Sequence, residues 1–185
     1  MEDSEILELY RSGEEQQAIN LIMRKYGERL YWHIRKMVCN HDDADDLLQN
    51  TFIKAWKALD TFREDAKLYT WLYRIATNEC ITFLKRQNIK ATLSLSDNSK
   101  AVANKLEADP FFNGDALQLA LQKAIAKLPP KQKAVFNMRY FDELKYEEIS
   151  EILNISVGAL KASYHHAYNK VQASIKEELN FLAKQ

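Results

Sequence analysis

Residues 146–178 read YEEISEILNISVGALKASYHHAYNKVQASIKEE. Apolar residues at helical spacing predict a short helix over residues 146–153, followed by a tight turn that ends at Ser156, a favourable N-cap residue. A second apolar stripe then predicts a long helix from Val157 toward Glu178. A short helix, a tight turn and a long helix together form the pattern of a helix-turn-helix.

The long helix has an outer face that suits duplex DNA. The second helix of such a motif lies in the major groove, where its N-terminal side chains meet base edges. Small residues on this face allow close approach, and Lys, His and Asn side chains, Asn169 among them, can contact phosphates or bases. The candidate DNA-contacting residues are Ser156, Gly158, Ala159, Lys161, Ala162, Ser163, His165 and His166. A helical hairpin with a solvated outer face would show the same periodicity, so the pattern alone leaves both interpretations open.

The rest of the chain also favours helices. The 185 residues include only 4 Gly and 3 Pro, too few for the frequent turns of an all-β fold. Residues 41–43 predict a break and an N-cap, because aspartates favour the positive end of a helix dipole. In the helix after this break, one apolar face holds Leu48, Phe52, Ala55, Trp56 and Leu59. Apolar periodicity predicts further helices over residues 16–38, 68–86, about 117–128 and 131–140.

Residues 88–114 differ in composition from the segments on either side. They are rich in Ser, Asn, Asp and Ala and show no sustained period. A structureless stretch of this length is unusual inside one compact domain. It predicts a flexible linker between an N-terminal domain, residues 1–87, and a C-terminal domain, residues 115–185. The expected fold class is all-α, with two small helical domains and the helix-turn-helix in the second.

The net charge of zero conceals an uneven distribution. Residues 1–50 carry 6 basic and 11 acidic side chains, whereas residues 51–90 carry 8 basic and 4 acidic ones. An acidic block followed by a basic block suggests two kinds of partner surface. Ordinary surface variation would give the same pattern, so charge alone does not decide.

Several classes of protein are disfavoured. No apolar run approaches the ~20 residues that span a bilayer, and the acidic N-terminus lacks the regions of a signal peptide, so no membrane insertion is expected. Two cysteines, Cys39 and Cys80, form no disulfide framework and predict a reducing, cytoplasmic location. The absence of a phosphate-binding glycine loop, an HExxH motif and a nucleophile elbow argues against catalysis, and no cofactor is expected. Cys39, His33 and His41 are too few ligands for a metal site, so none is predicted.

Two long segments resemble one family. Residues 128–171, LPPKQKAVFNMRYFDELKYEEISEILNISVGALKASYHHAYNKV, resemble the promoter-distal domain of bacterial sigma factors of the extracytoplasmic-function (ECF) group. Residues 42–87, DDADDLLQNTFIKAWKALDTFREDAKLYTWLYRIATNECITFLKRQ, resemble the domain of the same factors that binds core polymerase and melts the promoter. Both occur in the family's order, separated by a linker of suitable length. The resemblance implies a dissociable promoter-specificity subunit of RNA polymerase, without catalysis of its own.

The same resemblance implies that the start of the helix after residue 41 grips the coiled coil of the polymerase's largest subunit. Acidic and amide groups there can pair with an Arg-rich partner. The candidates are Asp45, Asp46, Leu48, Gln49, Asn50 and Phe52. Aspartates at this position would also stabilise the helix dipole without any partner.

Residues 62–79, FREDAKLYTWLYRIATNE, match the part of the family that captures the −10 element as single-stranded DNA. Aromatic rings stack on extruded bases for ~1–3 kcal/mol each, and basic side chains neutralise the backbone. The candidates are Phe62, Arg63, Lys67, Tyr69, Trp71, Tyr73, Arg74 and Asn78. About half of the rings are expected in the core, Trp71 foremost, because aromatic residues at helical spacing are usually buried.

The helix over residues 156–168 matches the reader of the −35 element but departs from the commonest family pattern. Ser163, His166 and Tyr168 stand where many members carry Arg, and Ala159 stands where Thr is usual. Fewer phosphate contacts predict weaker binding by this domain alone and a shallower salt dependence. The base preference of Arg-rich members therefore does not carry over.

The implied partners are core RNA polymerase, duplex DNA at −35, single-stranded DNA at −10, and an anti-sigma protein of the kind that the family often uses. The alternative is a stand-alone helix-turn-helix regulator that binds operators as a dimer, and a third class is an adaptor with protein contacts only. The aromatic and basic segment Phe62–Arg86 favours the sigma factor, since an ordinary repressor has no need of it. The sequence leaves open whether the two domains pack together in the free protein.

Overall fold

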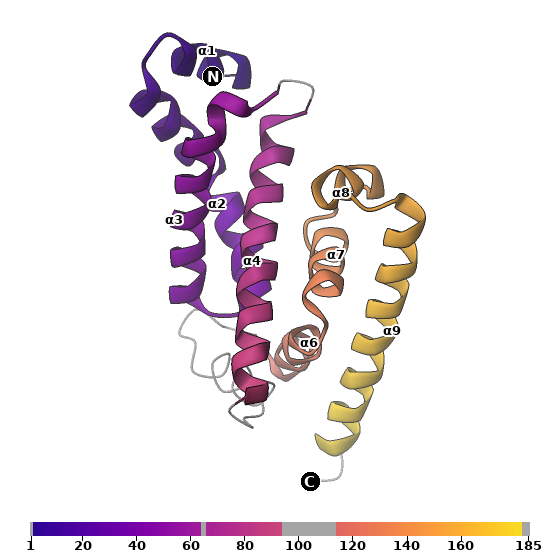
Figure 1. The fold of residues 1–185 in the computed structure, drawn as a ribbon. Helices are drawn as coiled ribbons and strands as arrows, with labels where there is room; N and C mark the ends of the chain where they lie inside the picture. The colour runs from indigo at the N-terminus through magenta and orange to yellow at the C-terminus, as the bar shows by residue number, and fades with distance from the viewer. Residues whose placement is uncertain (1, 64–65, 94–113, 183–185) are drawn as a thin grey trace.

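The computed structural model describes residues 2–63, 66–93 and 114–182, and all regular structure within them is helical (Figure 1). The N-terminal part contains α1 (Asp3–Arg11), α2 (Glu15–Val38), α3 (His41–Ala58), the 3₁₀ turn η1 (Leu59–Thr61) and α4 (Leu68–Leu93). The C-terminal part contains α6 (Ala116–Ala126), α7 (Pro130–Tyr140), α8 (Tyr146–Leu153) and α9 (Val157–Leu182). The predicted all-α fold in two helical parts is confirmed.

Two predicted boundaries are corrected. The N-cap of α3 is Asn40, whose side-chain oxygen accepts a hydrogen bond from the Asp43 N–H at 2.9 Å, so residues 41–43 lie inside the helix rather than before it. Helix α4 continues to Leu93, so residues 88–93, predicted as linker, are helical. The rest of the predicted linker, residues 94–113, lies outside the described residues.

Helix α1, only nine residues long, is absent from the sequence-based prediction. Contacts with α2 hold it in place. The Asp3 carboxylate accepts hydrogen bonds from the Tyr26 hydroxyl at 2.6 Å and from the Lys25 ammonium at 2.8 Å. The Ile6 and Leu7 side chains of α1 are buried, and burying each such side chain stabilises the fold by about 1.5–3 kcal/mol.

The N-terminal part is a bundle in which α2, α3 and α4 run side by side, with α1 across one end (Figure 1). Its core is built from fully buried aliphatic side chains that recur at helical spacing, such as Ile22, Leu30 and Ile34 of α2 and Leu72 of α4. This packing presents one side of α3 and one side of α4 outward.

The C-terminal part packs α9 against α6, α7 and α8. A separate apolar cluster joins Ile125 of α6, Phe136 of α7, and Ala167 and Val171 of α9. The cluster fixes which face of α9 is buried, so the opposite face is left for other contacts.

The turn between α8 and α9 has the geometry of a helix-turn-helix. Asn154 ends α8 in the left-handed conformation, with φ 53° and ψ 49°, and its N–H donates to the Ser150 carbonyl oxygen at 2.8 Å. Asn tolerates positive φ better than most residues. The Ser156 hydroxyl oxygen accepts from the Ala159 N–H at 3.4 Å. The predicted helix-turn-helix and its N-cap are therefore confirmed.

The two helical parts pack together, which the sequence left open. Helices α2 and α4 contact α7 and α8 (Figure 1). One continuous apolar core includes Leu72 of α4, Met138 of α7 and Ile149 of α8. The buried Lys133 of α7 donates to the Met37 carbonyl oxygen of α2 at 3.4 Å, and burial lowers the pKa of this lysine.

Candidate polymerase and DNA interfaces

One outward side of α3, here called the α3 face, combines acidic, amide and apolar side chains. Its exposed members are Asp46, Gln49, Asn50, Ile53 and Trp56. Asp45 and Leu48 lie half buried at its edge. Ile53 and Trp56 leave 49% and 42% of their surface exposed, so two large apolar groups stand beside the polar ones. Such a mixed surface suits a protein partner.

The α3 face corrects two sequence-based expectations. Phe52, a candidate contact residue, is buried at 6% exposure and supports the helix from the core side. Trp56, expected on the buried stripe, is exposed. Thr51 lies on the buried side instead: it is completely buried, and its hydroxyl is satisfied there by donating to the Leu47 carbonyl oxygen at 2.7 Å. The buried side of α3 is therefore rotated toward Thr51 and away from Trp56.

The aromatic −10 candidates form two pairs. The rings of Phe62 and Trp71 lie 5.2 Å apart, and those of Tyr69 and Tyr73 lie 4.8 Å apart. Phe62 and Tyr73 are buried, whereas Tyr69 and Trp71 are half buried. The expectation that part of these rings belongs to the core is confirmed. The expectation that Trp71 is the most buried ring is wrong, since Tyr73, at 1% exposure, is buried more deeply than Trp71.

The polar −10 candidates are exposed: Arg63, Lys67, Arg74 and Asn78. Arg74 reaches across to the C-terminal part, where its guanidinium donates to the Glu151 carbonyl oxygen of α8. Helix α2 adds a basic residue that the sequence did not single out, since the Arg29 guanidinium lies 4.2 Å from the centre of the Tyr69 ring. Positive charge thus borders the half-buried rings.

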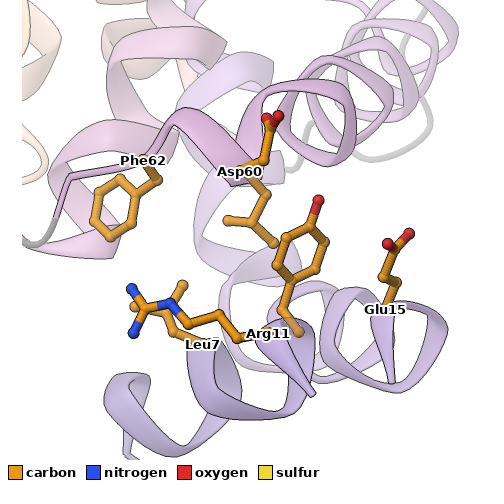
Figure 2. A pocket seen from close by; sticks show the side chains of 7 residues that line it. Leu7, Arg11, Glu15, Asp60 and Phe62 are labelled. Atoms are coloured by element: carbon orange, nitrogen blue, oxygen red, sulfur yellow. The ribbon is translucent and has the colours of Figure 1, made fainter. Parts of the chain in front are cut away.

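A cavity of about 430 Å³ lies beside Phe62, between α1 and η1. Figure 2 shows Phe62 and Asp60 across this cavity from Leu7 and Arg11 of α1. Its lining combines apolar side chains with charges of both signs. Burial and the nearby Asp60 and Glu15 carboxylates raise the pKa of Tyr10, which also lines it. The cavity is open to solvent next to the start of the −10 segment.

A polar group at the contact between the two parts, here called the Asp142 cluster, consists of His33, Lys36, Tyr73 and Asp142. Asp142 lies in the connection between α7 and α8, and its side chain is only 8% exposed. Lys36 donates to its Oδ1 at 2.6 Å, and the Tyr73 hydroxyl donates to its Oδ2 at 2.7 Å. His33 Nδ1 lies 3.2 Å from the same Oδ2.

Electrostatics within the Asp142 cluster favour the ionised carboxylate. Burial alone would raise the pKa of Asp142, but the hydrogen bonds and charges of His33 and Lys36 hold it well below its usual range. Burial and the adjacent Asp142 charge raise the pKa of Tyr73, which therefore keeps its proton and donates it. A predicted −10 residue is thus engaged by the C-terminal part.

The outer face of α9 is open, as the −35 candidates require. All eight candidates are exposed except Ser163, which is half buried. A Cβ added at Gly158 would meet nothing within 4 Å among the described residues, so packing does not demand glycine there. The small side chain instead leaves the start of α9 free to approach a partner closely. Helix α9 packs on α6, α7 and α8, and α6 and α7 lie between it and α4 (Figure 1).

Two α9 candidates have supporting partners that the sequence did not reveal. The Lys161 ammonium lies 5.8 Å from the centre of the Tyr146 ring, and the Arg139 guanidinium lies 5.3 Å from the same ring. The side chain of Asn169, one turn beyond His165, lies 3.1 Å from His165 Nε2. Tyr146 and Asn169 therefore orient side chains on the outer face of α9.

A membrane-spanning segment and a metal site, both considered from the sequence, are not found among the described residues. Within this part of the chain, no helix is both long and apolar enough to cross a membrane. The described residues also contain no group of three His, Cys, Asp or Glu side chains placed to hold a metal ion. Cys39 and Cys80 are free and buried, and burial raises the pKa of the Cys80 thiol.

Both helical parts match known protein families. Residues 22–89 match sigma-70 region 2, and residues 118–171 match sigma-70 region 4. These regions in this order define a sigma factor of RNA polymerase. The chain is 32% identical over 171 residues to the ECF RNA polymerase sigma factor SigW of Bacillus subtilis, covering 88% of this chain and 91% of the relative. It is also 32% identical over 193 residues to the ECF RNA polymerase sigma-E factor of Escherichia coli K12, covering 94% and 96%.

Solved structures share the fold. CnrH, in complex with the cytosolic domain of CnrY, superposes with a TM-score of 0.65 at 23% identity, covering 95% of this chain and 97% of CnrH. The sigma factor RpoE of Bartonella quintana, in complex with the anti-sigma factor NepR, superposes with a TM-score of 0.63 at 21% identity, covering 85% and 96%.

The chain belongs to the ECF group of RNA polymerase sigma factors. It is a non-enzymatic initiation factor that directs promoter-specific transcription through regions 2 and 4.

Proposed function

We propose that this sigma factor uses three separate surfaces: the α3 face for core RNA polymerase, residues 62–78 for the −10 strand, and the start of α9 for the −35 duplex. The observation that carries the proposal is that each matched region leaves exposed the side chains that its partner's chemistry requires. Region 2 spans the first two surfaces and region 4 the third.

The α3 face supports the polymerase assignment through its composition. Asp46 supplies a charge for a basic partner, and Gln49 and Asn50 supply hydrogen bonds. Ile53 and Trp56 supply apolar area, and large aromatic side chains are frequent hot spots of protein interfaces. We therefore add Ile53 and Trp56 to the polymerase-binding residues and assign Phe52 to support of the helix.

The −10 assignment rests on half-buried rings bordered by positive charge. Trp71 and Tyr69 leave part of their rings exposed for stacking on unpaired bases. The exposed Arg63 and Lys67 suit the phosphate backbone, and the exposed Asn78 suits a base edge or the sugar.

The −35 assignment rests on the open face of α9. Lys161 can contact a phosphate or a guanine, and His165 and His166 can donate hydrogen bonds to bases or phosphates. Gly158 and Ala159 at the start of the helix allow close approach to the major groove.

The wider setting follows from the same assignment. We propose an N-terminal domain that ends with α4 and a C-terminal domain over residues 115–185. A factor that works with RNA polymerase acts where the chromosome is, so we propose a cytoplasmic location. Two solved structures of the same fold are complexes: RpoE is bound to the anti-sigma factor NepR, and CnrH is bound to the cytosolic domain of CnrY. We propose an anti-sigma partner for this protein as well.

The decisive experiment is transcription from a promoter library by purified core polymerase, with and without this protein. Start sites that appear only with the protein support the proposal and reveal both promoter elements together. Sequence-specific DNA binding without polymerase, and no new start sites, would instead favour a stand-alone regulator.

Matched variants assign the surfaces in the same assay. Trp56→Ala should reduce activity at all promoters alike and be compensated by more polymerase, because it weakens assembly. Lys161→Ala should reduce activity in a way that depends on the −35 sequence. If both variants act identically at every promoter, the separation of surfaces is wrong.

A further inference from the structure

The Asp142 cluster joins the two helical parts through charge as well as apolar contact. Lys36 and His33 belong to α2 and Tyr73 to α4, whereas Asp142 belongs to the C-terminal part. All three groups that hold the carboxylate therefore lie in the N-terminal part. If the C-terminal part moved away, the Asp142 carboxylate would leave and these three groups would form an empty anion-binding site.

Three hydrogen-bond donors define the chemistry of this site. The Lys36 ammonium supplies a positive charge and donates to Asp142 Oδ1, and the Tyr73 hydroxyl donates to Oδ2. The ionised carboxylate only accepts, so His33 Nδ1 donates to Oδ2. His33 Nε2 lies 2.9 Å from the Thr77 hydroxyl oxygen, which holds the ring in place. The site therefore presents one cation and two further donors to one carboxylate.

A DNA phosphate matches the chemistry of this site. A phosphodiester carries one negative charge and two non-bridging oxygens that accept hydrogen bonds, as the Asp142 carboxylate does. Tyr73 and its neighbour Arg74 also belong to the proposed −10 surface. Both are engaged by the C-terminal part, Tyr73 by Asp142 and Arg74 by the Glu151 carbonyl oxygen.

We propose that Asp142 occupies a phosphate site of the N-terminal domain, in which His33, Lys36 and Tyr73 bind a backbone phosphate of the −10 strand once the C-terminal domain moves away. The inference rests on the proposed function, since it adds residues to the same −10 surface. Asp142 competes with DNA for this site. Only the fraction of molecules in which it is released binds the strand, so the apparent affinity falls by that fraction.

The first test measures competition by fluorescence anisotropy, using the full chain without polymerase and a labelled single-stranded oligonucleotide of random sequence. Asp142→Asn removes the charge and keeps the shape. It should tighten binding about tenfold or more, because losing one partner of a buried ion pair shifts an equilibrium by at least that much. The matched control is Glu143→Gln, which removes the same charge from the adjacent exposed residue and should leave the affinity unchanged. Asp142→Ser gives a second variant, and circular dichroism verifies that each is folded.

The second test identifies the ligand as a phosphate. In the Asp142→Asn background, Lys36→Gln should make the slope of log affinity against log salt shallower by about 0.7, the value for one lost phosphate contact on a single strand. Lys57→Gln, which removes an exposed lysine of α3, is the matched control and should leave the slope unchanged.

The outcomes separate this inference from the proposed function. Tighter binding by both Asp142 variants and a shallower slope only for Lys36→Gln support the phosphate site. Unchanged affinity of both Asp142 variants, or equal slopes for Lys36→Gln and Lys57→Gln, overturns it. Transcription by the wild-type chain with core polymerase is scored independently, because a sigma factor without this phosphate site still produces start sites. If the wild-type chain produces start sites but Lys36→Gln and Lys57→Gln have equal salt slopes, the phosphate site is refuted and the proposed function is not.

Discussion

The link from Thr77 to His33 predicts a measurable loss of stability when only the hydroxyl is removed. Thr77 is completely buried, and its hydroxyl oxygen lies 2.9 Å from His33 Nε2. Thr77→Val keeps the branched shape but leaves the buried His33 Nε2 without its hydrogen-bond partner. An unsatisfied buried polar group costs about 1–3 kcal/mol. A loss of about 2 kcal/mol lowers Tm by roughly 4–8 °C for a domain of this size.

The matched control for this prediction is Thr51→Val in α3. Thr51 is equally buried, but among the described residues its hydroxyl bonds only to the Leu47 carbonyl oxygen one turn earlier. Removing that bond leaves no buried donor behind, so the free energy of unfolding should change by less than about 1 kcal/mol. Urea denaturation followed by far-UV circular dichroism measures both variants. If Thr77→Val is as stable as Thr51→Val, the hydrogen bond between Thr77 and His33 does not stabilise the fold as argued.

Three further predictions concern the proposed surfaces and a helix cap. Trp56→Ala should weaken binding to core polymerase by about 2 kcal/mol, roughly 30-fold, in a pull-down titration. Trp32→Ala, which removes an equally exposed ring from α2, should have no effect, and equal losses would argue against the α3 face. Lys161→Ala should make the salt slope for a selected −35 duplex shallower by about 0.9, whereas Lys176→Ala, further along α9, should not. Asn40→Ala should lower the free energy of unfolding by about 1 kcal/mol through loss of the α3 cap, and an unchanged urea midpoint would contradict that role.

The sequence predicts the helices correctly where apolar periodicity is strong and a cap residue marks the start of the helix. Ser156 marked the start of α9, because capping chemistry acts locally. Helix α1 could not be predicted in this way. It depends on the hydrogen bonds from Lys25 and Tyr26 to Asp3, and partners more than twenty residues away leave no local pattern.

The candidate sites follow only in part, for a similar reason. Helical spacing places Trp56 on the apolar face of α3, but in the structure Thr51 is buried and Trp56 is exposed. Sequence periodicity treats Thr51 as polar, whereas the structure satisfies its hydroxyl locally and buries it. The Asp142 cluster is harder still, since its partners lie 69 to 109 residues from Asp142 along the chain. Only the packing of the two helical parts brings these charges together.

Because the two helical parts pack together, the three proposed surfaces differ in how accessible they are in the free protein. The α3 face and the outer face of α9 are exposed in the packed arrangement, whereas Tyr73 and Arg74 are engaged by the C-terminal part. Opening the contact would expose apolar residues such as Met138 and Ile149, which are now completely buried. That cost requires a partner with higher affinity for the open arrangement, because a ligand shifts an equilibrium only by its difference in affinity for the two states. Polymerase on the α3 face and duplex DNA on α9 each bind a surface that is exposed in both arrangements, so they favour the open one only through the spacing that simultaneous binding imposes on the two helical parts. Where that spacing exceeds the packed one, release of the −10 surface follows assembly rather than preceding it.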